Sequence, residues 1–142
     1  MRPSDWNAQV SQLMKKTMDK PFRRGVNDCV THVADAVILM SGIDIIAEGR
    51  GYKSKEAGIA IMNEYGCKSL ADIVDRHFER EPHHRRLKKG DIVYRKTSSG
   101  ETLGLLWDQM KVYLRAENGG FEVSKLQRAD IGWSIDKVKN GR

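Results

Sequence analysis

The stretch "RRGVNDCVTHVADAVILMSG", residues 23–42, sets a cysteine between two polar residues and a long apolar run. Apolar side chains recur at the three- and four-residue spacing of one helix face, at Val30, Val33 and Val37. Asp28 is a suitable N-cap for this helix, and Gly42 is placed to end it. The stretch therefore predicts a helix whose first residue is Cys29.

Cys29 at this position has two interpretations. The unpaired N–H groups and the dipole of a helix start stabilise a thiolate, which is the form in which cysteine acts as a nucleophile. A free cysteine on an apolar helix is also one of the residue types most often buried for packing alone. From the stretch itself, both interpretations stay open.

The flanking sequence predicts helices first and strands afterwards. Helical spacing and capping residues recur in three further segments, residues 5–18, 54–66 and 69–80, and Pro82 ends the last of them. Short segments rich in β-branched and aromatic residues then alternate with turn sequences, at residues 91–96, 102–108, 110–116, 120–126 and 132–136. We expect one α+β domain over residues 1–142, with helices up to about residue 82 packed on an antiparallel β-meander at about residues 88–136.

The composition of the 142 residues bounds the class of protein. Hydrophobic residues make up 39% and charged residues 31%, as in a folded globular chain. We expect no membrane span and no secretory signal, because no apolar run is long enough and the first ten residues are polar. The protein is then made in a cytoplasm. Two cysteines are too few for a disulfide scaffold.

The net charge of +6 suits an anionic partner, and much of the excess lies in the basic cluster at residues 85–89. A nucleic-acid-binding module is one hypothesis for this charge. No aromatic residue interleaves with the cluster and no nucleic-acid motif surrounds it, so a solvated loop is the favoured interpretation.

A cysteine nucleophile needs a base, and four histidines are available. His32 lies three residues after Cys29 on the same helix, so its ring is a neighbour of the thiol and the weak candidate for this role. The predicted strands hold no histidine. Cys29 and His32 also form half of a zinc-ligand pattern, but Cys67 has no paired ligand, so we expect no metal and no cofactor.

The order of helices and strands, together with two dipeptides, makes the chain similar to a known family. Asp28-Cys29 opens a helix, and Gly90-Asp91 opens the first long strand. The chain thereby resembles the papain-like cysteine peptidases of the NlpC type, which act on cell walls. It is most similar to a small branch found in tailed phages and prophages, along nearly its whole length. Further shared features are Trp6, Pro21-Phe22, Ser41–Asp44, Arg50–Tyr52, Leu103–Leu105 and a late "GWSI".

One departure from the superfamily decides between two functions. The resemblance implies a catalytic histidine on the strand that follows the one opened by Gly90-Asp91, and Thr102 stands at that position. The implied third polar residue would lie near Leu114–Ala116, which offers no histidine or carboxamide. Threonine cannot act as a base at neutral pH.

We therefore expect a structural or assembly component of the phage tail tip, located in the virion and bound to other tail-tip proteins. The alternative is an active cysteine hydrolase that cuts peptidoglycan during DNA entry. A phage tail would deliver such an enzyme without a secretory signal, and peptidoglycan would then be its partner.

Overall fold

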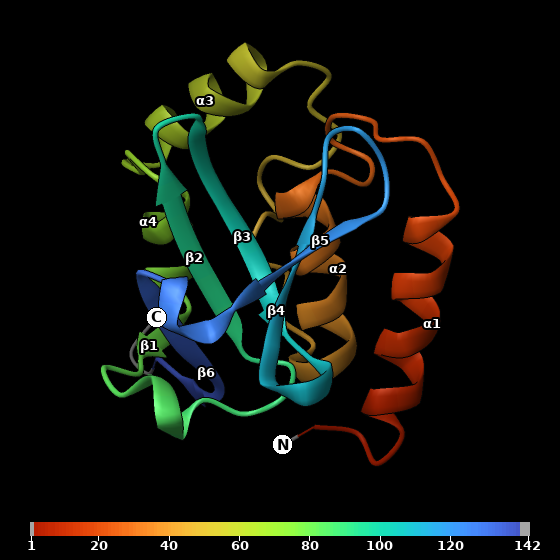
Figure 1. Ribbon diagram of the computed structural model, residues 1–142. Coiled ribbons are helices and arrows are strands. Elements are labelled where there is room, and N and C mark those ends of the chain that lie inside the picture. The colour runs from red at the N-terminus through yellow and green to blue at the C-terminus, as the bar shows by residue number, and fades with distance from the viewer. Residues whose placement is uncertain (1, 140–142) are drawn as a thin grey trace.

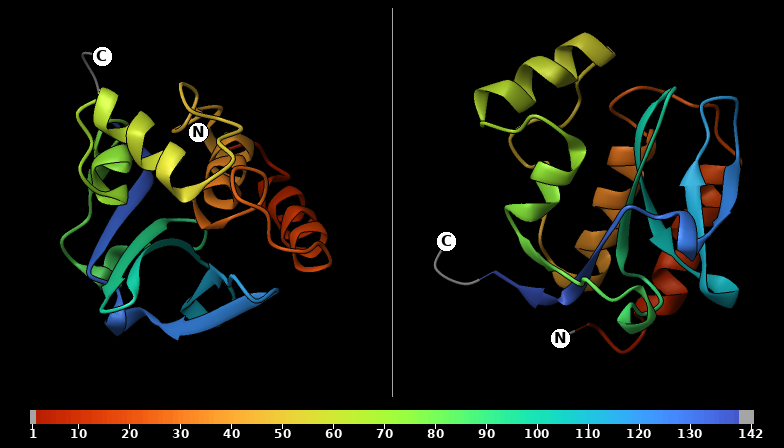
Figure 2. Two further views of the ribbon diagram at one scale, coloured as in Figure 1. Left: turned by 90° about the horizontal axis from the view of Figure 1, so that it is seen from above. Right: turned by 60° about the vertical axis from the view of Figure 1, so that its left-hand side comes forward.

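The computed structural model describes residues 2–139 and has two layers, with four helices on one side of a six-stranded antiparallel sheet (Figures 1 and 2). The helices are α1 (Trp6–Met18), α2 (Cys29–Ser41), α3 (Lys55–Glu64) and α4 (Leu70–Asp75). The strands are β1 (Phe78–Arg80), β2 (Ile92–Thr97), β3 (Gly100–Leu106), β4 (Lys111–Arg115), β5 (Phe121–Lys125) and β6 (Ile131–Val138). Short 3₁₀ turns lie at His84–Arg86, Asp108–Met110 and Leu126–Arg128. The α+β prediction is confirmed.

The central helix α2 forms as its sequence predicts. The Asp28 carboxylate accepts a hydrogen bond from the Thr31 N–H at 2.9 Å, which caps the first turn. Gly42 ends the helix with a φ of 76°, a left-handed conformation that glycine adopts without steric cost. The apolar face of α2 packs on β3 and β6, and α1 packs beside it. This burial holds the start of α2 against the sheet.

The fourth predicted helix is too long. It ends at Asp75, and Phe78–Arg80 form β1, an edge strand that pairs with β6. Phe78 is completely buried, as it would also be on a helix face, so the apolar spacing does not separate the two structures. The pairing with a distant strand decides the local conformation.

The sheet is not a simple meander. Strands β2 to β5 follow each other in chain order, but β6 returns to lie between β1 and β2. The sheet also curls, since Arg95 of β2 donates a hydrogen bond to Ser124 of β5 across the outer face at 3.2 Å. A small second core fills this curl, made of Leu87, Val93, Leu106, Val112 and Leu114.

The ladder between β3 and β4 is short. It ends at the pair Gly104 and Leu114, although β3 pairs with β2 from Gly100 onward. A Cβ atom on Gly104 would lie 2.5 Å from the Leu114 side chain, so only glycine permits this close approach. Beyond it the β2–β3 and β4–β5 hairpins diverge, as Figure 1 and the right view of Figure 2 show. The start of α2 lies at this divergence.

Candidate functional site

The loop before α2 is held by its own polar side chains. The Asn27 amide accepts from the Arg23 N–H at 2.7 Å and donates to the Pro21 carbonyl at 2.9 Å. The Asp28 carboxylate, besides capping α2, accepts from the Gly25 N–H at 3.0 Å and from the Tyr52 hydroxyl. Asn27 and Asp28 therefore fix the position of the next residue, Cys29.

Cys29 is half-buried at the start of α2 and faces β3. Burial raises the pKa of its thiol above the ordinary value, whereas interaction with the Thr102 hydroxyl and the Leu103 backbone lowers it by less. The negative charge of Asp28 also acts to raise it. The thiol is therefore neutral at pH 7, and the helix start does not convert it to a thiolate.

The structure brings Cys29 and Thr102 together, and they are the two residues that the resemblance assigns to the nucleophile and to the missing histidine. The Thr102 hydroxyl is 3.3 Å from the Leu103 carbonyl oxygen, to which it donates. Neither this hydroxyl nor a backbone amide can take the thiol proton at neutral pH. The contact between α2 and β3 thus has the geometry of a nucleophile and its partner without the base.

A cleft of about 940 Å³ opens beside Cys29. Its walls come from the loop before α2, from α3 and the start of α4, from the β2–β3 hairpin and from the turn between β4 and β5. Cys29, Tyr52 and Thr102 all line it. The volume falls within the range of ligand sites in proteins.

His32 is buried and turned to other partners. Its Nδ1 lies 3.1 Å from the Thr17 hydroxyl, and its ring packs on Phe121 with centroids 5.0 Å apart. The Thr17 hydroxyl donates to the Leu13 carbonyl, so it accepts from His32, whose Nδ1 carries the proton. Burial, and then the charge of Arg115, lower the His32 pKa to about 4. These contacts do not favour His32 as a base for Cys29.

We predict that His32 makes the protein less stable in acid. The unfolded chain binds a proton at His32 near pH 6.5 and the folded chain only near pH 4, so stability falls as the pH decreases between these values. The loss amounts to about 3 kcal/mol in the free energy of unfolding at pH 4. Urea denaturation at several pH values measures it.

In the His32→Asn variant, whose amide retains a donor for Thr17, this part of the acid sensitivity is expected to disappear. His83→Gln is the matched control, because His83 is exposed. Equal pH dependence in the wild-type protein and the His32 variant would show that His32 is not the group responsible.

Arg115 lies within Leu114–Ala116, the segment where the resemblance implies a third polar residue, and the structure gives it a role that the sequence did not predict. Its side chain is 4% exposed, and its guanidinium donates to three backbone carbonyls. These belong to Lys20 at 2.8 Å, Gly120 at 3.0 Å and Asn27 at 3.1 Å. Arg115 thereby joins the loop before Cys29 to the β4–β5 turn and shapes one side of the cleft.

Tyr52 is the contact that sequence reasoning missed. Tyr52 belongs to the shared feature Arg50–Tyr52, but nothing in the sequence indicates that its hydroxyl bonds the capping carboxylate of Asp28. The hydroxyl stays protonated, since burial and Asp28 raise the Tyr52 pKa. The pair closes the side of the cleft next to the start of α2.

Other expected features have the following places in the structure. Residues 85–89 lie mostly exposed before β2, and Lys89 pairs with Asp108 at 2.8 Å. Within residues 2–139, no group of three or more His, Cys, Asp or Glu side chains is arranged to hold a metal ion. In the same residues, no helix is long and apolar enough to span a membrane.

One family model matches the chain. Its description is "Domain of unknown function (DUF6950)", and the match covers residues 1–135. No curated protein matches the chain.

Proposed function

The chain belongs to the DUF6950 family, and from this premise we propose that it is a non-catalytic protein with an NlpC-type papain-like fold. We place it at the tail tip of a tailed phage or prophage, as a structural or assembly component of the virion. It is synthesised in the host cytoplasm. In the virion its partners are other tail-tip proteins.

Three features support the fold assignment. Asp28 and Cys29 open a helix that packs on an antiparallel sheet, and Gly90-Asp91 directly precede β2. Cys29 meets β3, the strand after β2, as the superfamily resemblance implies. The family match, over residues 1–135, extends across all of these elements.

The observation that carries the non-catalytic assignment is the pairing of Cys29 with Thr102. A cysteine hydrolase needs a thiolate or a base in contact with the thiol. Here threonine occupies the base position and burial raises the thiol pKa. Both effects act against nucleophilic attack at neutral pH.

The alternative is an active peptidoglycan hydrolase. The cleft beside Cys29 favours it, because a nucleophile at the start of a helix and open to a cavity is a catalytic arrangement. The base would then have to come from a partner chain in the tail.

The two functions differ in the effect of Cys29→Ala. We expect the wild-type protein and this variant to release equal, background amounts of soluble fragments from purified peptidoglycan sacculi. We also expect a phage that carries the variant to assemble tails and infect normally. Fragment release that depends on Cys29, or loss of infection with a folded variant, would support the hydrolase instead. Denaturation curves of the variant control for folding.

A further inference from the structure

Strand β5 is one edge of the sheet, and its outer side has no neighbouring strand within residues 2–139. It pairs with β4 in an unbroken register from Phe121 to Lys125 and lies at the outside of the molecule in both views of Figure 2. The other edge strand, β1, has only three residues and an irregular register. Short or irregular strands protect a sheet edge from further pairing, and β5 lacks both features. The outer edge of β5 is therefore the place where another strand can add.

The backbone groups on this outer edge follow from the hydrogen bonds on the inner one. The Ala116 N–H donates to the Gly120 carbonyl at 3.1 Å, so the even-numbered residues of β5 direct their N–H and C=O groups toward β4. The odd-numbered residues direct theirs outward. The outer edge therefore presents both backbone groups of Phe121 and Val123 and the Lys125 N–H. No hydrogen bond within residues 2–139 occupies these groups.

The side chains of β5 leave this edge accessible. None of its five residues is buried, and Val123, at the centre, is 48% exposed. Phe121 packs on His32 on the helix side of the sheet, so Val123 lies on that side as well. Glu122 and Ser124 lie on the opposite face. A large apolar side chain exposed on an edge strand marks a contact site for a second strand.

The sequence of β5 is self-complementary about Val123. A two-fold axis at this residue would pair two copies antiparallel, with Val123 opposite Val123 and Phe121 opposite Lys125. Each Val123 N–H would then donate to the Val123 carbonyl of the second copy. Each Lys125 N–H would donate to the Phe121 carbonyl of the second copy. The two valine side chains would cover each other, and the Lys125 ammonium would meet the Phe121 ring.

Arg95 supplies charge complementarity in the same register. Its guanidinium donates to the Ser124 hydroxyl at 3.2 Å and lies 3.8 Å from the Glu122 carboxylate, which is largely exposed. In the two-fold pairing, Glu122 lies opposite Ser124 of the second copy, with Cβ atoms about 5 Å apart. Each Glu122 would therefore gain the Arg95 of the second copy as a partner. An axis at Glu122 would instead set two carboxylates opposite each other, so the charges favour the axis at Val123.

We propose that two copies of this chain associate through β5, in an antiparallel pairing with a two-fold axis at Val123 that joins their two sheets into one. The occupant of this edge is a second copy because its own β5 supplies the matching backbone groups, apolar residue and charges. The inference goes beyond the proposed function and holds whether or not Cys29 is catalytic, since the Cys29 thiol takes no part in the contact.

Sedimentation velocity over protein concentrations from about 10 µM to about 1 mM tests the association, because an interface of one strand pair belongs to the small and weak class. We expect a dimer whose fraction rises with concentration. Amide hydrogen exchange at both ends of this range locates the contact. The Val123 and Lys125 amides are expected to become protected only in the dimer. The Glu122 and Ser124 amides bond to β4 and are expected to stay protected throughout. A monomer at every concentration, or a dimer in which the Val123 amide exchanges as in the monomer, would overturn the proposal.

Exchange of the two charges tests the pairing itself. In the variants E122R and R95E, taken singly, like charges face each other across the contact, and dimerisation is expected to weaken at least about tenfold. An equimolar mixture of the two variants restores opposite charges, and a heterodimer is expected to form. The controls E117R and R24E carry the same net charges, alter an exposed ion pair outside β5 and are expected to dimerise as the wild-type protein does. Equal weakening by the controls, or absence of a heterodimer in the mixture, would contradict the β5 pairing.

Proline at the two-fold axis removes an outward donor. Val123→Pro is expected to abolish dimerisation, and the fold tolerates it because the Val123 N–H donates nothing to β4. Val123→Thr keeps the N–H and is expected to retain the dimer. Circular dichroism controls for folding, and the charge exchange decides the question if the proline variant does not fold. A folded Val123→Pro protein that dimerises as well as the wild-type protein would show that β5 is not the contact.

Discussion

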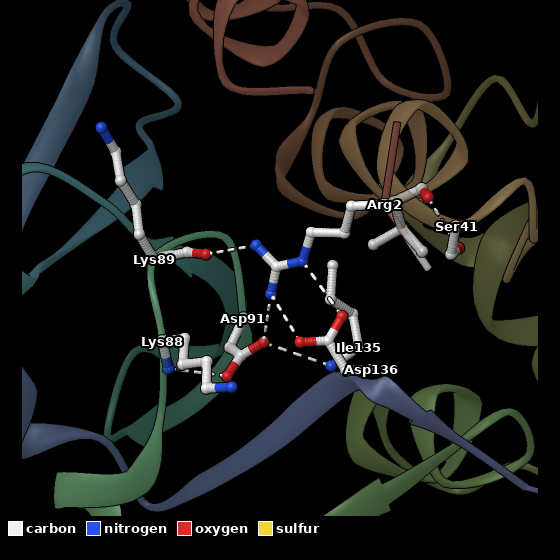
Figure 3. A network of polar contacts seen from close by, with 8 residues as sticks. Arg2, Ser41, Lys88, Lys89, Asp91, Ile135 and Asp136 are labelled. Carbon is white, nitrogen blue, oxygen red and sulfur yellow. Dashed lines mark hydrogen bonds and ion pairs between the residues drawn. The ribbon is translucent and has the colours of Figure 1, made fainter. Parts of the chain in front are cut away.

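Replacement of Arg2 by methionine is expected to lower the free energy of unfolding by about 3 kcal/mol at pH 7. Arg2 joins the start of the chain to β2 and β6, as Figure 3 shows. Its guanidinium lies 3.1 Å from the Asp91 carboxylate, 2.6 Å from the Lys89 carbonyl and 3.2 Å from Asp136. Asp91 is 1% exposed, so its charge would lose its ion-pair partner while it stays buried.

The loss caused by the Arg2 variant is expected to depend on pH. Burial raises the pKa of Asp91, although the N–H groups of Lys88 and Ile135 and the charge of Arg2 oppose this. Stability that depends on Arg2 is therefore fully present only above the folded pKa of Asp91. As the pH falls through that value, the carboxyl becomes neutral and the variant approaches the wild-type protein.

Urea denaturation at neutral and acidic pH measures the effect of the Arg2 variant. Arg128→Met, at an exposed position, is the control and is expected to cost less than about 0.5 kcal/mol. The loss of unfolding free energy in the Arg2 variant could be as small as in the control, or could grow in acid. Either result would contradict a stabilising ion pair between Arg2 and Asp91.

Replacement of Arg115 by methionine is expected to cost about 3 kcal/mol of unfolding free energy. Three backbone carbonyls would lose a charged donor, and the bond to the Asn27 carbonyl is buried, so water does not readily replace it. Faster amide exchange in residues 20–28 is expected as well, because Arg115 binds the Lys20 and Asn27 carbonyls before α2.

Arg95→Met is the matched control for the Arg115 variant. Arg95 also lies on a strand and lines the cleft, but it is partly exposed and its glutamate partner is 3.8 Å away. Removal of the Arg95 guanidinium is expected to lower the free energy of unfolding by about 1 kcal/mol or less. Amide exchange in residues 20–28 is expected to stay unchanged. Equal exchange rates at residues 20–28 in the wild-type protein and the Arg115 variant would show that Arg115 does not hold this loop.

Local sequence was sufficient to predict the elements whose structure depends on neighbouring residues. The cap at Asp28, the helix from Cys29 to Ser41 and its end at Gly42 follow from residue types within one segment. The β2–β3 hairpin likewise follows from a polar turn between two strand-like segments. The helix–strand order therefore predicted the α+β class.

Contacts between distant segments could not be predicted in this way. Strand β1 exists because β6 returns to pair with it, and the apolar spacing around Phe78 fits a helix equally well. The return of β6 to β2 also leaves no local sequence pattern.

The same limit holds at the candidate site. The place of Thr102 opposite Cys29 came from a family resemblance, because spacing along the chain does not bring two residues 73 positions apart into contact. The bonds of Arg115 and Tyr52 to the loop before α2 were missed for the same reason. Each joins polar groups that separate segments bring together only in the folded chain.

The most direct test of the central claim is the pH dependence of Cys29 alkylation by iodoacetamide, followed by mass spectrometry in a Cys67→Ser background. We predict slow alkylation at pH 6 to 7 and a thiol pKa above that of free cysteine, because burial outweighs the groups that lower it. Thr102→His, which supplies an imidazole at the base position, is the comparator and is expected to react about tenfold faster at pH 7. Rapid alkylation of the unchanged Thr102 protein at pH 6, with a pKa below that of free cysteine, would contradict the claim that this site is not catalytic.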